Sequence, residues 1–281
     1  MAYKDILIHL DDSEICAERV AAATALAKRE EARVTGIALA LESTISTYIG
    51  IDFPSSLTEA QQEIVQKSAQ SAVEQFEAAA KEAGVDFESR IIKCAGTKAP
   101  ARMAFFARHA DLIFMGQPNP DSSAKDFQES LLENVLHNSG RSVYVVPYIG
   151  RYEAKVRKAV IAWDGGKKAV RAVNDAIPML KARKSVDVLV INPKKRSKDL
   201  GGAQGENLVS HLQRHGVNAK VVVKVNPELT VDTIIQNHIS DSGADLLVMG
   251  AFGHSRLREK AFGGVTETIL HQMIVPVLMS E

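Results

Sequence analysis

The residues best suited to chemistry lie between positions 244 and 264. Residues 244–250 (ADLLVMG) form a short apolar run that ends on glycine, which is typical of a buried parallel strand. Gly253 and the pair Gly263-Gly264 then bound a polar loop, and helical apolar spacing follows. A strand, a glycine loop and a helix N-terminus in this order suit an anion, because free backbone N–H groups and the positive end of the helix dipole meet there.

These glycines have two interpretations that spacing alone leaves open. They let a phosphate approach the backbone without a Cβ atom in the way, or they merely permit a tight turn and close helix packing. The loop is no Walker A motif, since no Gly-Lys-Ser/Thr sequence closes it, and no GxGxxG pattern follows the first apolar run. The sequence therefore indicates a nucleotide phosphate site of another type.

Further candidate groups are polar, aromatic or basic. Asp164 follows an apolar run, and its carboxylate suits a ribose hydroxyl, a metal ion or a helix cap. The single tryptophan, Trp163, either flanks a base or belongs to the core. His254 and Arg256 lie in the glycine loop, where they contact phosphate or are simply solvated. The histidines form no HExxH motif, and no Ser/His/Asp or Cys/His arrangement stands out, so we expect no catalytic or metal-ligating residues.

Composition excludes several classes of protein. The chain has 281 residues, of which 46% are hydrophobic and 24% charged, and 34 basic residues balance 34 acidic ones. Because these charges cancel, the chain has no overall positive electrostatic field that would attract nucleic acid or an anionic membrane. Two cysteines are too few for a disulfide framework, and no apolar run approaches the ~20 residues of a membrane helix. The N-terminus does not resemble a signal peptide. We therefore expect a soluble cytoplasmic protein with neither nucleic-acid nor membrane partners.

The chain alternates apolar runs with helical patterns, and then repeats. We expect strands at 4–10, 33–40, 87–96, 110–116 and 142–148, and helices at 14–29, 59–83, 100–109 and 131–137. Asp11, Asp12 and Ser13 are expected to supply a turn and a helix N-cap. The second half contains five corresponding strands, expected at 158–164, 185–192, 218–225, 244–250 and 274–280. The sequence thus predicts two domains, 1–150 and 155–281.

Strands that alternate with helices predict a parallel sheet covered on both faces. Each half is then a five-stranded, doubly wound, Rossmann-like α/β domain, and ligands bind such sheets at the carboxyl ends of the strands. Asp164, Asn192, Gly250 and Gly263 all follow strands in this scheme. We expect them to converge on one edge.

The spacing Gly250-x2-Gly253-x9-Gly263, followed by Gly-Val-Thr, resembles the Gly-x2-Gly-x9-Gly-Ser/Thr motif of ATP-binding universal stress proteins. Both halves are similar to that family over nearly their whole length, in the aspartate after the first strand, the Ala-Asp-Leu fourth strand and the closing Val-Pro strand. The resemblance implies a tandem member with two adenine nucleotide alpha hydrolase-like domains related by pseudo-twofold symmetry.

The resemblance also implies ATP as the ligand, alone or with Mg²⁺, and a set of contact residues. These are Ala162, Trp163, Asp164, Ile191, Met249, Gly250, Gly253, Gly263, Gly264, Val265 and Thr266. Two positions depart from the pattern. Gly264 stands where the family has a hydroxyl, which Thr266 would partly replace, and Phe252 stands where the family often has a polar residue.

The first half departs further from the motif. Gly116 is followed by QPNPDSS, with no second glycine, and the two prolines remove amide donors. We expect a nucleotide site of this type only in the second half. The loop over 42–60, which contains Tyr48 and Phe53, either covers an apolar pocket or partner surface or is a simple surface insertion.

Three functions remain open at this stage. The first is a nucleotide-binding stress-response regulator that acts on an unidentified protein partner. The second is a slow ATPase, for which only Asp164 offers a candidate group. The third is a scaffold without a nucleotide. The resemblance also implies that the closing strands, 142–148 and 274–280, meet across a pseudo-twofold axis as an internal dimer, with further homodimerisation open.

Overall fold

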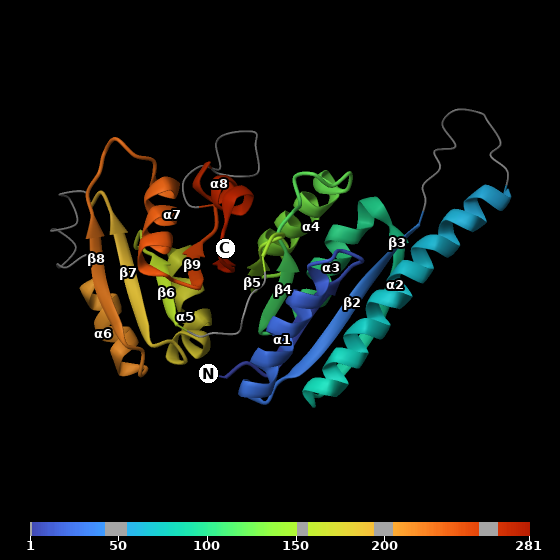
Figure 1. The fold of residues 1–281 in the computed structure, drawn as a ribbon, viewed down its shortest axis with the longest axis horizontal. Coiled ribbons are helices and arrows are strands. Elements are labelled where there is room, and N and C mark those ends of the chain that lie inside the picture. Colours follow the sequence, from blue (N-terminus) through green and yellow to red (C-terminus); the bar gives the residue numbers. More distant parts are fainter. Residues whose placement is uncertain (1, 43–54, 151–156, 194–204, 253–263) are drawn as a thin grey trace. The chain divides into compact units, whose positions relative to one another are not determined.

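The computed structural model describes residues 2–42, 55–150, 157–193, 205–252 and 264–281. It divides into two compact units. The N-terminal unit consists of Tyr3–Gly116 and Ser123–Arg141, and the C-terminal unit of Met1–Ala2, Gln117–Ser122 and Ser142–Glu281. Strands and helices alternate along both units (Figure 1). The expected α/β class is confirmed.

The N-terminal unit contains a parallel sheet in the order β3-β2-β1-β4. Its strands are β1 (Asp5–Leu10), β2 (Arg33–Glu42), β3 (Phe87–Ala95) and β4 (Leu112–Gly116). Its helices are α1 (Cys16–Glu30), α2 (Ser55–Ala83), the short η2 (Gly96–Lys98), α3 (Ala99–Ala107) and α4 (Lys125–Asn138).

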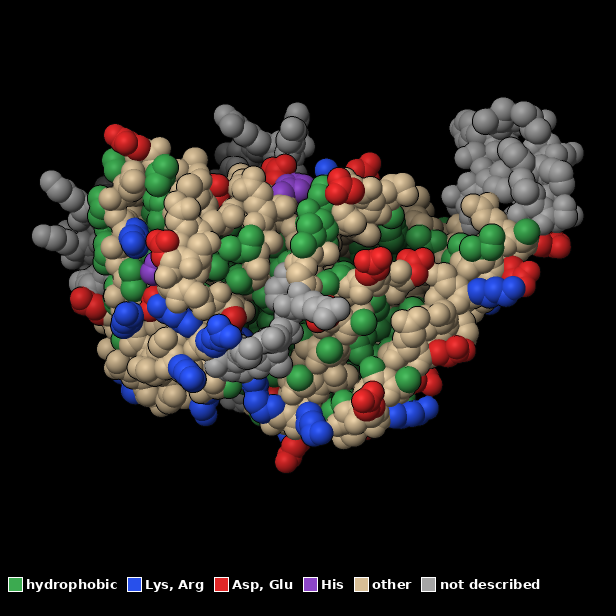
Figure 2. All heavy atoms as spheres, in the orientation of Figure 1, with side chains coloured by type: hydrophobic (Ala, Val, Ile, Leu, Met, Phe, Trp, Pro, Cys, Tyr) green, Lys and Arg blue, Asp and Glu red, His purple; other side chains and the backbone are tan. Residues whose placement is uncertain are grey.

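Helices cover both faces of this sheet, as the alternation of β2 shows. A Cβ atom on Gly36 would lie 2.7 Å from the ring of Phe76, which places α2 on that face. The next residue, Ile37, lines a cavity together with Phe106 of α3 and therefore faces the other side. The exposed side of α2 carries acidic and basic side chains (Figure 2), including the ion pair of Lys67 with Glu63 at 2.7 Å.

The C-terminal unit contains a sheet in the order β5-β10-β9-β6-β7-β8. Its strands are β5 (Ser142–Val146), β6 (Lys158–Ala162), β7 (Ser185–Ile191), β8 (Ala219–Lys224), β9 (Leu246–Gly250) and β10 (Val277–Ser280). Its helices are α5 (Lys167–Lys181), α6 (Glu206–Arg214), α7 (Val231–Ser242) and α8 (Gly264–Gln272).

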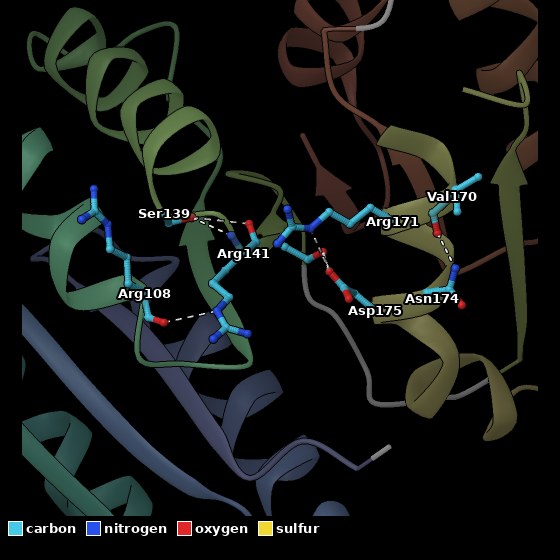
Figure 3. Close-up of polar contacts among 8 residues, drawn as sticks. Arg108, Ser139, Arg141, Val170, Arg171, Asn174 and Asp175 are labelled. Carbon is cyan, nitrogen blue, oxygen red and sulfur yellow. Dashed lines mark hydrogen bonds and ion pairs between the residues drawn. The ribbon is translucent and has the colours of Figure 1, made fainter. Parts of the chain in front are cut away.

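The strand β5 comes from the first half of the sequence but belongs to the C-terminal unit. It runs antiparallel to β10, with Val145 opposite Val277, so the expected meeting of the two closing strands is confirmed. All other strand pairs described for this sheet are parallel. The Ser142 hydroxyl of β5 also donates to Asp175 of α5 at 2.7 Å, and Arg171 lies 3.8 Å from that carboxylate (Figure 3).

Helices cover both faces of the second sheet too. Gly205, just before α6, would meet the side chains of Val188 and Val190 if it carried a Cβ atom. On the opposite face of β7, Oδ2 of the buried Asp187 lies 2.9 Å from Nε2 of His238 in α7 and 2.7 Å from Nζ of Lys158. Nζ of Lys220 also lies 3.9 Å from Oδ1 of Asp187, so two ammonium groups and an imidazole surround this carboxylate.

One local expectation is wrong. Asp12 and Ser13 do not cap α1, whose N-cap position is Ile15 without a side-chain hydrogen bond. Asp11 instead accepts a hydrogen bond of 3.1 Å from the Ser13 N–H, which closes the expected turn. The Ser13 hydroxyl donates to Asp11, and Asp12 accepts from the Ser68 hydroxyl at 3.1 Å, so both side chains have partners other than the helix amides.

Within the described ranges, no helix combines the length and the apolar character needed to cross a bilayer. Cys16 and Cys94 are both free and buried.

The ends of α3 and α4 in the N-terminal unit are joined by Arg141, whose Nε donates to the Arg108 carbonyl at 3.2 Å (Figure 3).

Candidate functional site

The candidate site lies at the carboxyl edge of the C-terminal sheet. Strand register places Ala162 at the end of β6 opposite both Leu189 of β7 and Met249 of β9. Ile191 ends β7 two residues further on. The expected convergence of the strand ends that precede Asp164 and Gly250 is therefore present.

Asp164 is exposed at this edge, directly before α5. Its Oδ1 atom accepts a hydrogen bond of 2.8 Å from the Gly166 N–H, and Gly165 between them has a φ of 75°. The carboxylate thus shapes the turn into α5, whose N-cap residue is Gly166. The positive end of the α5 dipole points to the same edge.

Trp163 continues the sheet for one residue beyond β6. Its backbone N–H donates to the Leu189 carbonyl at 3.0 Å, and its side chain is half-buried. The strand end beside Asp164 is therefore fixed by backbone pairing.

Asn192 fixes the end of β7 in a similar way. It has a left-handed backbone, with φ at 45°, and its side chain both donates to the Asn226 carbonyl at 3.0 Å and accepts from the Asn226 N–H at 2.8 Å. The loops after β7 and β8 are thereby joined. This asparagine is a scaffold for the edge.

Gly250 is needed for helix packing. A Cβ atom at this position would lie 2.6 Å from the backbone nitrogen of Ala169 and 2.9 Å from the carbonyl carbon of Lys168. The close approach that requires glycine is that of α5 to β9. Of the two interpretations of Gly250, phosphate approach or close helix packing, the structure directly supports close helix packing.

The stem of the glycine loop is fastened to α8 by Thr266. Its buried Oγ1 accepts a hydrogen bond of 2.9 Å from the Phe252 N–H, and Phe252 has a left-handed φ of 54°. Gly264, the first residue of α8, is exposed, and a Cβ atom there would meet nothing within 4 Å. Val265 is half-buried beside it. The first turn of α8 is therefore held next to the end of β9.

Lys168 is a structural residue of this edge that sequence reasoning missed. Its Nζ donates to the Phe252 carbonyl at 3.0 Å and to Oε1 of Glu281 at 2.8 Å. It joins the start of α5, the end of β9 and the last residue of the chain. Its place in the Gly-Gly-Lys-Lys sequence directly after Asp164 is the sequence feature that could have pointed to this role.

Several predicted residues lie outside the described residues. They are Gly253, His254, Arg256 and Gly263 of the loop, and Tyr48 and Phe53 of the 42–60 segment. Their roles stay predictions.

The corresponding edge of the first half is built differently. Gln117, which follows Gly116, is buried, and its backbone N–H donates to the Val146 carbonyl at 2.8 Å. Its side chain donates to the Leu270 carbonyl at 2.6 Å and accepts from the Tyr148 N–H at 3.1 Å. The residue after the fourth strand is thus a crosslink within the C-terminal unit, with its donors already used.

The aspartate after β1 is also engaged. Oδ2 of Asp11 lies 2.8 Å from Nη2 of the fully buried Arg19 and 3.5 Å from Nδ1 of His9. Burial alone would raise the pKa of Asp11, but the guanidinium of Arg19, followed by His9 and Ser13, outweighs it and lowers that pKa to about 2. Burial lowers the pKa of His9 to about 4, with Asp11 opposing and Arg19 adding to the shift. Asp11 is therefore a carboxylate held in an internal network.

A cavity of about 210 Å³ lies elsewhere in the N-terminal unit, beside the start of β1. Thr35, Arg90, Phe106 and His109 are among the residues that line it. Arg90 is ion-paired with Glu88. The volume is below the ~300 Å³ at which ligand pockets usually begin, and the cavity is not part of the carboxyl edge.

Metal-ligating clusters are not found in the described part of the chain, where no three His, Cys, Asp or Glu side chains gather around a common point. The edge described above offers one exposed carboxylate, Asp164, and two helix N-termini. Such a set suits a polar organic anion, and any divalent cation would depend on that anion for most of its ligands.

Two segments of the chain, residues 2–147 and 155–280, match the model of the universal stress protein family. The chain belongs to this family. Universal stress protein Slr1230 from Synechocystis is 34% identical over 70 residues, a match that spans 22% of this chain and 24% of that relative. The shared stretch therefore covers a minor part of either protein.

Solved structures extend the likeness to the whole fold. A universal stress protein from Archaeoglobus fulgidus has a TM-score of 0.70 at 18% identity, covering 99% of this chain and 96% of its own. A putative universal stress protein from Pseudomonas aeruginosa has a TM-score of 0.58 at 15% identity, covering 99% and 93%. The tandem arrangement of Rossmann-like domains is thus shared with both proteins.

Some family members have been solved with nucleotides. One universal stress protein is in complex with cAMP, at 21% identity and a TM-score of 0.35, covering 53% of this chain and 100% of its own. Another, from Archaeoglobus fulgidus, is in complex with dAMP, at 17% identity and a TM-score of 0.36, covering 52% and 98%.

Proposed function

We propose that the protein is a nucleotide-binding regulator of the stress response that holds one ATP at the carboxyl edge of its C-terminal unit. The observation that carries the proposal is the register of Ala162 with Met249, which brings the exposed Asp164 to the edge where β9 ends and where Thr266 of α8 binds Phe252. The proposal rests on residues of this chain.

The nucleoside would lie against the ends of β6 and β7. Ala162, Trp163 and Ile191 are each half-buried there and offer apolar surface for a base. Asp164 is exposed and accepts hydrogen bonds, so it suits a ribose hydroxyl. We assign this end of the edge to recognition of adenosine.

The phosphates would lie beside α8. Gly264 is exposed at the helix start, where backbone N–H groups without intrahelical partners meet the positive end of the dipole. Thr266 contributes by holding Phe252 in place, in addition to its remaining O–H donor. Gly253, His254, Arg256 and Gly263 are proposed as further phosphate contacts on the basis of sequence. A Mg²⁺ ion would be held largely by the phosphates.

The regulatory part of the proposal follows from linkage. A ligand that binds one state of the protein more tightly than another stabilises that state, and a protein partner that prefers the same state then binds more tightly. We place this function in the cytoplasm, which the two free, buried cysteines support.

Calorimetric titration of the full chain with ATP, ADP, AMP and cAMP tests the proposal. We expect one ATP per chain and at least a tenfold weaker binding to Asp164→Asn, because one charge-assisted hydrogen bond is worth about 1.5–3 kcal/mol. Asp241→Asn is the matched control, since it removes an exposed carboxylate of the same unit away from the edge. Equal ATP affinity in the Asp164 and Asp241 variants would refute the site.

Mass spectrometry of nucleotide released from the freshly purified protein separates the other functions. Bound ATP that persists with Mg²⁺ supports a regulator. ADP that accumulates with time and Mg²⁺ would instead identify a slow ATPase, and a chain that neither carries nor takes up nucleotide would identify a scaffold.

A further inference from the structure

Arg19 is a charged side chain without any exposed surface. Charged residues are almost never fully buried unless they are paired. Its Nε donates to the His9 carbonyl at 2.8 Å, and Nη2 lies 2.8 Å from Oδ2 of Asp11. The Arg19 guanidinium of α1 therefore binds both the end of β1 and Asp11, the residue that follows this strand.

The position of this pair corresponds to the candidate site of the second half. The two halves share one register, because Ile8 lies opposite Phe114 and Ile161 lies opposite Val248. Asp11 and Asp164 thus occupy the same place after the first strand of each half. Gly116 and Gly250 likewise end the corresponding strands β4 and β9.

The space between the aspartate and the glycine differs between the halves. In the first half, a Cβ atom on Gly116 would collide with Nη1 of Arg19, so the guanidinium lies directly beside this glycine. In the second half, the position that corresponds to Arg19 is Ala172, whose methyl group is also buried. Ala172 offers Asp164 no charge, and the Asp164 carboxylate is exposed.

We propose that the Arg19 side chain permanently occupies, in the first half, the position that corresponds to the proposed nucleoside site beside Asp164 in the second half. It neutralises the carboxylate that a ribose would need and fills the volume beside Gly116. The chain then has one exchangeable ligand position and one permanently closed position. This inference rests on the proposed function of the Asp164 edge, because that edge defines what the corresponding position would bind.

The chemistry of the position also defines the ligand that Arg19 excludes. Pro118 and Pro120 have no amide N–H, and the N–H of Gln117 is used by Val146. Phosphate donors of the kind found at a glycine loop are therefore scarce in this segment. The excluded ligand is adenosine, rather than a nucleoside triphosphate.

Arg19→Ala in the full chain tests the inference, with adenosine as the probe in calorimetry. The variant frees Asp11 and vacates the guanidinium volume, so we expect one more adenosine site per chain than in the wild type. Arg19→Met is the matched control, because its long side chain keeps most of the volume and gains no site. A folded Arg19→Ala variant with the wild-type number of sites would overturn the proposal.

Two combined variants locate the gained site. Adding Asp11→Asn to Arg19→Ala should remove the extra site, whereas adding Asp164→Asn should remove only the wild-type one. If the wild type binds no nucleotide, the proposed function fails, but a site gained in Arg19→Ala still supports the role of Arg19. The two failures are thus distinguishable.

A photoaffinity experiment covers the case in which Arg19→Ala does not fold. Wild-type protein is irradiated with 8-azidoadenosine, and the labelled peptides are identified by mass spectrometry. Label confined to peptides from the second half supports the closed position. Label on the peptide that contains β1 and Asp11, competed by adenosine, would overturn it.

Discussion

Oγ1 of Thr266 lies 2.9 Å from the backbone nitrogen of Phe252 and accepts its hydrogen. This bond joins the end of β9 to the first turn of α8 across the segment that carries the glycine motif. It also gives Phe252 a partner in a left-handed conformation that is uncommon for a bulky residue. The Thr266 hydroxyl thus binds Phe252 on its N–H side, while Lys168 binds the Phe252 carbonyl.

Thr266→Val should therefore affect both stability and ligand binding. The Phe252 N–H loses its acceptor, which costs about 1–2 kcal/mol in the free energy of unfolding, and ATP affinity should fall about tenfold as the stem loosens. Urea unfolding and calorimetry measure the two effects. Thr266→Ser keeps the hydroxyl and should retain ATP affinity, so a loss of the same size in both variants would contradict this role.

Gly250 and Gly264 should respond oppositely to alanine. Gly250→Ala places a methyl group against the backbone of α5, and such overpacking costs about 3 kcal/mol in the free energy of unfolding. Gly264→Ala points into open space and should change the free energy of unfolding by no more than about 0.5 kcal/mol. Urea unfolding measured side by side decides the matter, and equal losses would contradict the packing role of Gly250.

Stability should fall as pH decreases from neutrality, because of His9. The pKa of His9 is about 4 in the folded state and 6.5 for the ordinary side chain, so the unfolded chain binds the proton first. The stabilising contribution is complete above pH 6.5 and is lost progressively down to pH 4. Between pH 7 and pH 5 the loss should be about 2 kcal/mol. Urea unfolding of wild type and His9→Gln at both pH values checks this, since the variant lacks the contribution.

Gln117 should be more important for stability than its loop position suggests. Gln117→Leu leaves the Tyr148 N–H and the Leu270 carbonyl without their partner, and each such buried group costs about 1–3 kcal/mol in the free energy of unfolding. Gln213→Leu on the exposed side of α6 is the control and should be nearly neutral, because the hydrogen bond from its side chain to the Ala219 carbonyl is long, at 3.5 Å. Comparable unfolding midpoints for the two variants would show that Gln117 does not act as a crosslink.

The pattern of apolar residues was sufficient to predict the order of the strands in both halves. Runs such as ADLLVMG end on glycine and are long enough for one buried strand, and β9 ends at Gly250 as expected. The order of the strands depends on local periodicity, which a single sequence displays directly. The pairing of β5 with β10 is a long-range contact, and it was expected from the family resemblance rather than from periodicity.

Long-range side-chain contacts were beyond such reasoning. Arg19 lies in an alanine-rich helical pattern, and nothing local indicates that its guanidinium reaches Asp11 inside the fold. Lys168 reaches Glu281 across most of the second half, and Gly250 meets α5 through backbone atoms. Each contact depends on how the helices pack, and spacing along the chain carries no information about that.

The antiparallel pairing of β5 with β10 has a consequence for dissecting the protein. A fragment that begins at residue 155 lacks β5 and leaves one side of β10 with unpaired backbone groups, although β10 is apolar and flat. Exposed edges of this kind recruit strands from other molecules and promote aggregation. Separate expression of the two halves should therefore yield self-associating material, and a second half that carries a tethered copy of residues 142–148 should remain monodisperse.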